Sequence, residues 1–275
     1  MGSIQFVDAR PGTRRELPHN PGKSWRTRAV GALKGFAIHH TAGGDDPGRT
    51  AAYHVGASHT SGSGMAGLAY TFYITLAGVI WWAWDLDQQT WSQGGGTVPD
   101  ANGDGKLNKA DGLGAANAGY LAIVLGGSFE SRWNHTGQQP TFLQLHALQT
   151  LIGHLTGACE SEILPDDLLG AVDHLSPGDA WPHSAFGKAA CPGALTEDQI
   201  KIWHTSEGAK KSWTDRDWQQ ALSDLGYPLG LWGPKGDGVD GSWGGSSKAA
   251  LVAFQRDQGL PQTGDRDKRT ESALF

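Results

Sequence analysis

Histidine and cysteine side chains stand where apolar segments of the sequence end. His39 and His40 close the apolar run GFAIHH, and His174 closes the run LLGAVDH. Cys191 stands in the loop GKAACPGAL, which Pro192 stiffens. Catalytic zinc sites take three protein ligands from nitrogen, sulfur or carboxylate and leave a fourth position for water. Two imidazoles and one thiolate would meet that need if the strand ends lie side by side.

The segment DANGDGKLNKAD, residues 100–111, has the spacing of a calcium-binding loop. Oxygen-bearing side chains occupy positions 1, 3, 5 and 12 of the segment and glycine occupies position 6, as in an EF-hand loop. The predicted ligands are Asp100, Asn102, Asp104, Asp111 and, at position 7, Lys106. We expect a structural Ca²⁺ ion that rigidifies an insertion in the larger domain. The alternative is a turn rich in aspartate and glycine that binds no ion.

Short strands and one long helix would position the zinc-binding residues. GFAIHH and GYLAIVLGG read as strands, and the continuous apolar run of the second is typical of a central strand covered on both faces. The stretch LAYTFYITLAGVIWWAWDL predicts two strands joined at Ala77 and Gly78, and LLGAVDH predicts another short strand. PTFLQLHALQTLIGHL has apolar residues at helical spacing, with Thr141 as the N-cap. These elements predict an α/β domain with a central mixed β-sheet flanked by helices.

The sequence changes character toward its C-terminus. The polar segment 206–211 predicts a linker between a first domain, residues 1–205, and a second domain, residues 212–275. In the second domain TDRDWQQALSDLGY, KAALVAFQRDQGL and KRTESALF predict three helices. Thr214 and Asp217 would open the first of them as an acidic capping box. The small size of this helical unit suggests an accessory role.

The composition argues against several classes of partner. A chain of 275 residues is long enough for two domains. The formal net charge of −6 argues against nucleic acid as the main partner, since phosphate binding needs a basic surface. No apolar run approaches the roughly 20 residues of a membrane span, and the N-terminus lacks the apolar core of a secretory signal. The two cysteines, Cys159 and Cys191, allow one disulfide at most, and we expect a monomer.

Five segments occur in the order seen in zinc-dependent N-acetylmuramoyl-L-alanine amidases, the group that includes phage lysozyme-type amidases and peptidoglycan-recognition proteins. They are AIHHTAG, LAYTFYI, GYLAIVLGG, LLGAVDH and KAACPG, and the resemblance covers about residues 30–200. The C-terminal segment separately resembles the three-helix peptidoglycan-binding module through LSDLGY, VDGSWGGSSKAALVAFQRDQGL and TGDRDKRTESALF. Both resemblances imply bacterial peptidoglycan as the partner. The first implies hydrolysis of the amide between the lactyl group of N-acetylmuramic acid and L-alanine.

The resemblance implies one set of zinc ligands. The family places its first ligand on the histidine after the first strand, His39, and its third on the cysteine before Pro-Gly, Cys191. His174 follows the strand after the long helix and matches the second ligand, whereas His183 is the alternative because it lies the family's usual eight positions before the cysteine. We favour His174, because the strand GAVDH would orient its side chain and LSPGDAWPH reads as a loop insertion. His40 would be a neighbour in the groove or a support for the metal shell.

Further residues of the groove follow from the same resemblance. Tyr70 matches the family's catalytic tyrosine, whose hydroxyl would donate to the oxyanion or relay a proton; an ordinary strand aromatic is the alternative. Lys188 resembles a lysine that stabilises the same charge, although it stands three positions before the cysteine instead of two. His54, in AYHV, is a further candidate for contact with substrate.

Tryptophan is abundant, with 12 residues, and flat aromatic faces suit stacking on sugar rings. In the segment WWAW, strand alternation would place Trp82 and Trp84 on one face and Trp81 on the other. Trp82 and Trp84 are therefore candidates to line a glycan groove, with core packing as the alternative.

The sequence predicts a zinc peptidoglycan amidase with a wall-binding module, most like a phage endolysin. A cysteine as third ligand favours an active enzyme, because this position is serine in family members that have lost catalysis. The small module would raise the local substrate concentration by tethering. With no secretory signal visible, we expect synthesis in the cytoplasm and action on the cell wall after phage-type or other release. The alternatives are a non-catalytic peptidoglycan-recognition protein and a zinc peptidase that cuts within the stem peptide.

Overall fold

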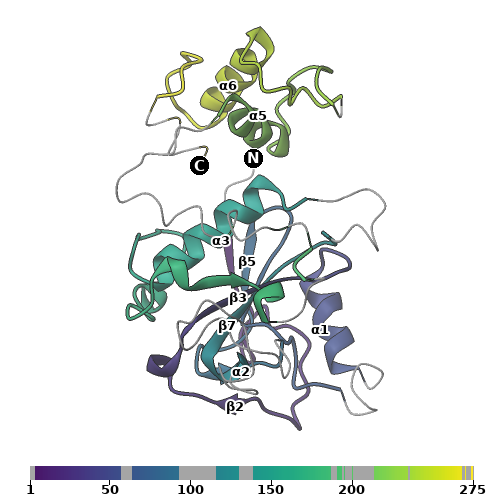
Figure 1. Cartoon of the computed structure of the whole chain (residues 1–275), viewed down its shortest axis with the longest axis vertical. Coiled ribbons are helices and arrows are strands. Elements are labelled where there is room, and N and C mark those ends of the chain that lie inside the picture. Colours follow the sequence, from purple (N-terminus) through teal and green to yellow (C-terminus); the bar gives the residue numbers. More distant parts are fainter. Residues whose placement is uncertain are drawn as a thin grey trace.

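The computed structural model describes most of both predicted domains. The described residues are 4–56, 64–92, 116–129, 139–186, 191–193, 195, 200, 214–234, 236–267, 270 and 274. Figure 1 shows the β-sheet of the larger domain and, at one end of the molecule, the helix pair of the C-terminal unit. The predicted linker at 206–211 and the predicted calcium loop at 100–111 lie outside the described residues, so both remain predictions.

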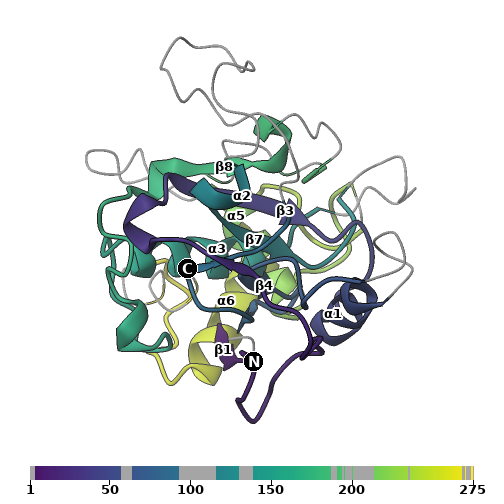
Figure 2. The ribbon, with the colours of Figure 1, turned by 90° about the horizontal axis from the view of Figure 1, so that it is seen from below.

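A six-stranded mixed sheet forms the centre of the larger domain, as predicted. Its strands are β1 (Gln5–Asp8), β3 (Gly35–His40), β4 (Phe72–Ile74), β5 (Val79–Trp82), β7 (Tyr120–Leu125) and β8 (Ala180–Pro182). They lie in the order β1-β5-β4-β7-β3-β8, and Figure 2 shows β8, β3, β7 and β4 in succession. The strands β4, β7, β3 and β8 are parallel, whereas β5 pairs antiparallel with β4 and parallel with β1. Parallel strands end at the same edge of a sheet, so the ends of β3 and β8 meet.

Helix α3 (Phe142–Leu155) covers one face of the sheet. It begins with the predicted N-cap Thr141, whose side chain forms a capping box with Gln144. Every residue of β3 and β7 is buried, as their continuous apolar runs predict. Alternate residues of β3, Phe36 and Ile38, join the main hydrophobic core with the apolar face of α3. Odd-numbered residues of β3 therefore face the other side of the sheet.

The second face carries helix α1 (Pro47–Val55), which is capped by the Asp46 side chain. A smaller cluster there packs Ala51 of this helix with Tyr73 and Val124 of the sheet. The described part of the domain also contains the short helix α2 (Ala116–Gly119) and a ribbon of β2 (Arg26–Thr27) with β6 (Gln88–Gln89).

The strand predicted at LLGAVDH does not form. The 3-10 turn η3 (Asp166–Leu168) precedes it, and Gly170 adopts a left-handed φ of 64°. Gly170 N donates to His154 O at 2.8 Å and Val172 N donates to Leu155 O at 2.9 Å, so the segment is bonded to the end of α3. The eighth strand forms at AWP instead, within the segment predicted to be a loop insertion. The turn η4 (Pro177–Asp179) precedes this strand, and the turn η5 (His183–Phe186) follows it.

The C-terminal unit contains α5 (Asp215–Asp224) and α6 (Gly245–Asp257), and the capping box predicted at the start of α5 is present. The helices enclose a separate core that includes Trp218, Leu222, Leu251 and Phe254. The third helix, predicted at KRTESALF, lies largely outside the described residues.

A hydrogen bond and an apolar contact join the two units. Phe142 N, at the start of α3, donates to the Asp224 carboxylate at 2.7 Å, and the Phe142 side chain packs against the core of the helix pair. None of the helices in the described ranges is long and apolar enough to cross a membrane. Cys159 and Cys191 do not form a disulfide.

Candidate metal centre and active site

Three metal-binding side chains meet at the end of β3, on the face opposite α3. His39, His183 and Cys191 each offer a ligand atom, and these atoms all lie within 4.8 Å of one another. The Cys191 sulfur lies 3.9 Å from Nδ1 of His39, and the centroids of the two imidazole rings are 4.0 Å apart. Zinc–sulfur and zinc–nitrogen bonds of about 2.3 and 2.0 Å allow two ligand atoms of one ion to lie up to about 4.3 Å apart. The sulfur–nitrogen distance therefore fits a shared ion.

The pairing of β3 with β8 explains why the two histidines are neighbours. Phe36 pairs with Ala180 and Ile38 pairs with Pro182 in a parallel register. One residue further along, His39 and His183 fall side by side on adjacent strand ends, which are roughly 4.8 Å apart in a sheet. The second imidazole of the centre is thus supplied by the residue that directly follows the three-residue strand β8.

The structure corrects the preferred assignment of His174 as a ligand. Nε2 of His174 lies 3.1 Å from Leu33 O, which precedes β3. His39 is six residues further along the extended chain, a separation of roughly 20 Å. His174 therefore lies toward the opposite end of the strand, because its segment is bonded to α3 instead of extending the sheet. The spacing of eight residues between His183 and Cys191 was the sequence signal for the correct histidine.

The environment of His39 suits a metal ligand. The side chain is 1% exposed, and burial, together with the nearby His183 and His40, holds its pKa well below the usual value. The ring is therefore neutral near pH 7, which is the form that binds metal. Its Nε2 is buried and has no hydrogen-bond partner among the described residues. A neutral imidazole beside a thiol and a second imidazole is a donor set that zinc prefers. The residues present fit a zinc ion.

Tyr70 lies beside the metal group, two residues before β4. Its ring centroid is 5.1 Å from that of His39 and 5.7 Å from that of His54. Burial raises the pKa of the Tyr70 hydroxyl well above its usual value, and the nearby Cys191 raises it further. The phenol therefore stays protonated and keeps a proton to donate. The ring therefore lies next to the metal-binding residues, and its catalytic role remains a prediction.

His54 supports the segment that carries this tyrosine. It is 6% exposed on α1, and its Nδ1 accepts a hydrogen bond from Ala69 N at 3.2 Å. The bond fixes the backbone one residue before Tyr70. The structure thus places His54 next to the site, with its ring nitrogen used to hold the protein backbone.

His40 faces away from the metal group. Consecutive residues of a strand point to opposite faces, so His40 lies on the side of α3 while His39 lies on the open side. The His40 Nδ1 accepts a hydrogen bond from Phe129 N at 3.1 Å, and the ring packs 5.8 Å from that of Phe129. Its expected place in the substrate groove is therefore corrected. It holds the segment that follows β7.

Trp82 and Trp84 do not form one face of a groove. Trp82 is 3% exposed and stacks on Phe72 within the main core, which corrects its expected contact with substrate. β5 ends at Trp82, so the alternation stops there, and Trp84 packs against the smaller cluster on the other side of the sheet. Trp84 Nε1 donates to Leu68 O at 2.8 Å and so supports the segment leading to Tyr70.

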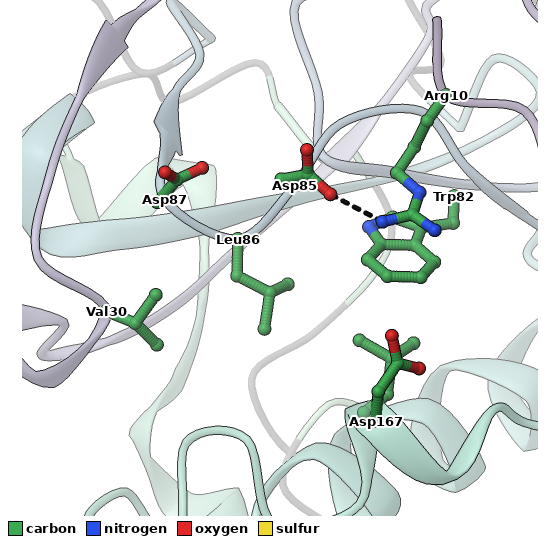
Figure 3. A pocket seen from close by; sticks show the side chains of 8 residues that line it. Arg10, Val30, Trp82, Asp85, Leu86, Asp87 and Asp167 are labelled. Carbon is green, nitrogen blue, oxygen red and sulfur yellow. Dashed lines mark hydrogen bonds and ion pairs between the residues drawn. The ribbon is translucent and has the colours of Figure 1, made fainter. Parts of the chain in front are cut away.

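A cavity of about 300 Å³ lies beside Trp82 and is lined by none of the metal-binding residues (Figure 3). The guanidinium carbon of Arg10 sits 3.5 Å from the centroid of the Trp82 ring. Arg10 also pairs with Asp8 at 2.7 Å and Asp85 at 2.5 Å, and its hydrogen bond to Asp8 holds the pKa of that carboxyl below its usual value. Asp167 lines the opposite wall. The contacts of Arg10 tie the end of β1 to the end of β5.

The remaining predicted site residues cannot be placed. Lys188 and the five predicted calcium ligands lie outside the described residues, so their roles remain predictions.

A His-His-Cys group with two buried imidazoles lies on one face of a mixed α/β sheet, with a tyrosine beside it, and has the ligand set of a zinc hydrolase. Residues 29–194, more than half of the chain, match the family described as N-acetylmuramoyl-L-alanine amidase. The chain belongs to this family, and it is a peptidoglycan amidase. Residues 216–274 match a peptidoglycan binding domain, so the C-terminal unit is a wall-binding module.

Solved structures show a remote likeness. Peptidoglycan recognition protein SD from Drosophila is 16% identical, with a TM-score of 0.47, and the match covers 73% of this chain and 95% of that one. The amidase LysC from Clostridium intestinale is 16% identical, with a TM-score of 0.43 and coverage of 74% and 99%. An endolysin from a Thermus scotoductus bacteriophage is 15% identical, with a TM-score of 0.45 and coverage of 72% and 97%. A search of curated proteins found no match.

Proposed function

We propose that this enzyme cleaves the amide between the lactyl group of N-acetylmuramic acid and L-alanine of the stem peptide, using water activated at the His39–His183–Cys191 centre. The convergence of these three side chains at one end of β3 carries the proposal. It rests also on the family match, whose description names this bond. A zinc ion bound there would lower the pKa of a water molecule to about 7 and polarise the scissile carbonyl.

Side chains of the enzyme would then stabilise the negative charge that develops on the carbonyl oxygen during attack. Tyr70 keeps its proton and stands beside the metal-binding residues, so its hydroxyl can donate a hydrogen bond to the developing oxyanion. His54 holds the backbone before Tyr70 and so fixes the direction of that donor. Burial of the His39 ring keeps it neutral and available as a ligand.

Digestion of purified cell walls tests the reaction. We expect zinc near one per chain and the release of new L-alanine amines without new reducing sugar ends. Replacement of Cys191→Ser should lower both the zinc content and the release of amines.

Other outcomes would identify a different function. Walls that are bound with zinc present but release no amines would indicate a recognition protein without catalysis. Amines from residues other than L-alanine would indicate a peptidase that cuts within the stem peptide.

We further propose that the enzyme is a lytic endolysin that reaches the wall after release from the cytoplasm. The combination of an amidase domain with a wall-binding module in one chain supports this setting.

We expect the boundary between the amidase domain and the wall-binding module in the segment 206–211. On sequence grounds we also propose a structural calcium ion at residues 100–111, which should appear as a second metal that withstands substitution of the zinc ligands.

A further inference from the structure

The connection between α5 and α6 presents two large apolar side chains to solvent. Leu231 is 85% exposed and Trp232 is 78% exposed, whereas the other large apolar side chains among the described residues reach at most 58%. Neither residue belongs to the core of the helix pair. In Figure 1 the chain between α5 and α6 extends to the side of the two helices. An exposed apolar pair of this kind indicates an interaction site.

The backbone around this pair is held in one conformation. Leu229 and Val239, on either side, are buried in the core of the module, and Gly238 N closes the loop by donating to Trp232 O at 2.7 Å. Gly233 and Gly238 have φ values of 105° and 80°. A Cβ would lie 2.9 Å from Val239 O at the first and 2.6 Å from the Leu229 backbone at the second, so neither position accepts a side chain without a shift. Little conformational entropy is then lost when the exposed pair binds a ligand.

We propose that Leu231 and Trp232 form a contact site for the glycan strand of peptidoglycan. The flat indole face matches the apolar CH face of a pyranose ring, and the neighbouring leucine offers an apolar contact for the methyl group of an N-acetyl substituent. The match of this module to a peptidoglycan binding domain indicates which polymer it binds. The inference concerns how the wall is held and does not depend on the zinc chemistry.

Size and charge favour a glycan over other occupants. Two side chains are far fewer than the roughly 20–30 residues per side of a stable protein interface. The charged residues of the loop by sequence are Lys235, Asp237 and Asp240, which sum to a net negative charge. Anionic polymers and anionic lipid surfaces need a basic surface, so the loop suits an uncharged sugar better.

The test uses the full chain carrying Cys191→Ser, so that walls are not consumed. Binding would be measured to insoluble peptidoglycan and to oligomers of N-acetylglucosamine, an uncharged glycan that carries no stem peptide. We expect Trp232→Ala to weaken binding to both by about tenfold, and Trp232→Phe to keep most of it. Leu169→Ala, which truncates an aliphatic side chain that is 39% exposed in the amidase domain, is the matched control and should bind as the parent does. Thermal unfolding of Trp232→Ala should match that of the parent, since the indole is exposed.

Three results would overturn the proposal. They are undiminished glycan binding by Trp232→Ala, binding that requires the stem peptide, and a dimer that Trp232→Ala converts to a monomer. The hydrolytic proposal is tested separately, by measuring hydrolysis of a soluble muropeptide by Trp232→Ala with Cys191 intact. This variant should hydrolyse the muropeptide at the wild-type rate. If neither protein hydrolyses it, the hydrolytic proposal is wrong and the glycan-binding result still stands.

Discussion

His183 and His174 lie toward opposite ends of β3, and this difference decides which of them can share an ion with His39. His183 lies at the end of β8, next to the end of β3, whereas His174 contacts the carbonyl of Leu33, before β3 begins. Two histidines nine positions apart in the sequence therefore have unrelated roles.

Replacement of His183→Ala should abolish tight zinc binding, whereas His174→Ala should keep zinc near one per chain. Loss of residues that merely orient a ligand costs 10- to 100-fold in metal affinity, so loss of a ligand itself should cost more than about 100-fold. Metal analysis after dialysis measures the difference. Zinc retained by His183→Ala and lost by His174→Ala would reverse the assignment.

Replacement of Tyr70→Phe should lower kcat by about 10²- to 10³-fold while zinc stays bound, because it removes one donor to the developing oxyanion. Since the pKa of the phenol is raised, this donor should persist at alkaline pH. Steady-state hydrolysis of a soluble muropeptide measures the effect, with the exposed Tyr53→Phe as control. An unchanged kcat would leave Tyr70 with a packing role only.

Single-residue prediction from the sequence succeeded where a side chain follows a clear local signal. His39 ends an unmistakable apolar strand and Cys191 precedes Pro-Gly, and the structure brings both together. His183 was passed over because it follows a strand of three residues, AWP, that exists only through its pairing with β3. A strand so short, with a proline in it, has no periodicity of its own. Trp82 and Trp84 were misplaced because the alternation assumed for them stops where β5 ends.

At the scale of elements, α3 is joined to the sheet by a buried amide. Gln144 is fully buried, and its Nε2 donates to Ile74 O at 3.2 Å and to Gly126 O at 2.8 Å. Its Oε1 accepts from Thr141 N at 3.1 Å as part of the capping box. One side chain thus satisfies the ends of β4 and β7 and the start of the helix.

Replacement of Gln144→Leu should lower the free energy of unfolding by about 2–4 kcal/mol. Leucine has a similar shape but no donor, so the buried carbonyls of Ile74 and Gly126 lose their hydrogen-bond partner. Chemical denaturation of the full chain measures the loss. Gln88→Leu, on the partly exposed strand β6, is the control and should change the stability little. A loss below about 0.5 kcal/mol would mean that the backbone groups find other partners.

A pH dependence should originate on the same helix. Burial lowers the pKa of His146, which stacks on Phe142, to about 4. An unfolded histidine titrates near 6.5, so between about pH 6.5 and 4 the unfolded chain binds more protons and the stability falls as the pH falls. His146→Gln should remove about 1–3 kcal/mol of this acid sensitivity, measured as the difference between unfolding free energies at pH 7 and pH 4. Equal slopes for parent and variant would exclude His146 as the source.

On the scale of the whole molecule, two hydrophobic cores meet at the start of α3. The carboxylate of Asp224 accepts from the first N–H of that helix, where negative charge is favourable. The amidase core and the module core are otherwise separate clusters. The strands β3, β4, β5 and β7 and the helix α3 follow from the apolar patterns of the sequence. The contact between units could not be predicted, because it joins residues 82 positions apart.

Removal of the metal should act on one of the two cores. A ligand that binds only the folded state stabilises it, so chelation should lower the unfolding temperature of the amidase domain and leave the module transition in place. Calorimetry with and without a chelator that prefers zinc to calcium measures this, and Cys191→Ser should abolish the response. A response that persists in Cys191→Ser would mean that the zinc is held by other residues.

β8 has consequences beyond the chemistry of the centre. It is an edge strand of three residues that ends in Pro182, which has no N–H to offer to an incoming strand. A strand this short forms few hydrogen bonds to the sheet, so an ion shared by His39 and His183 would help to hold β8 against β3. Without the metal, β8 should separate from the sheet first. The metal-free enzyme would then be inactive and also open to proteolysis at this edge.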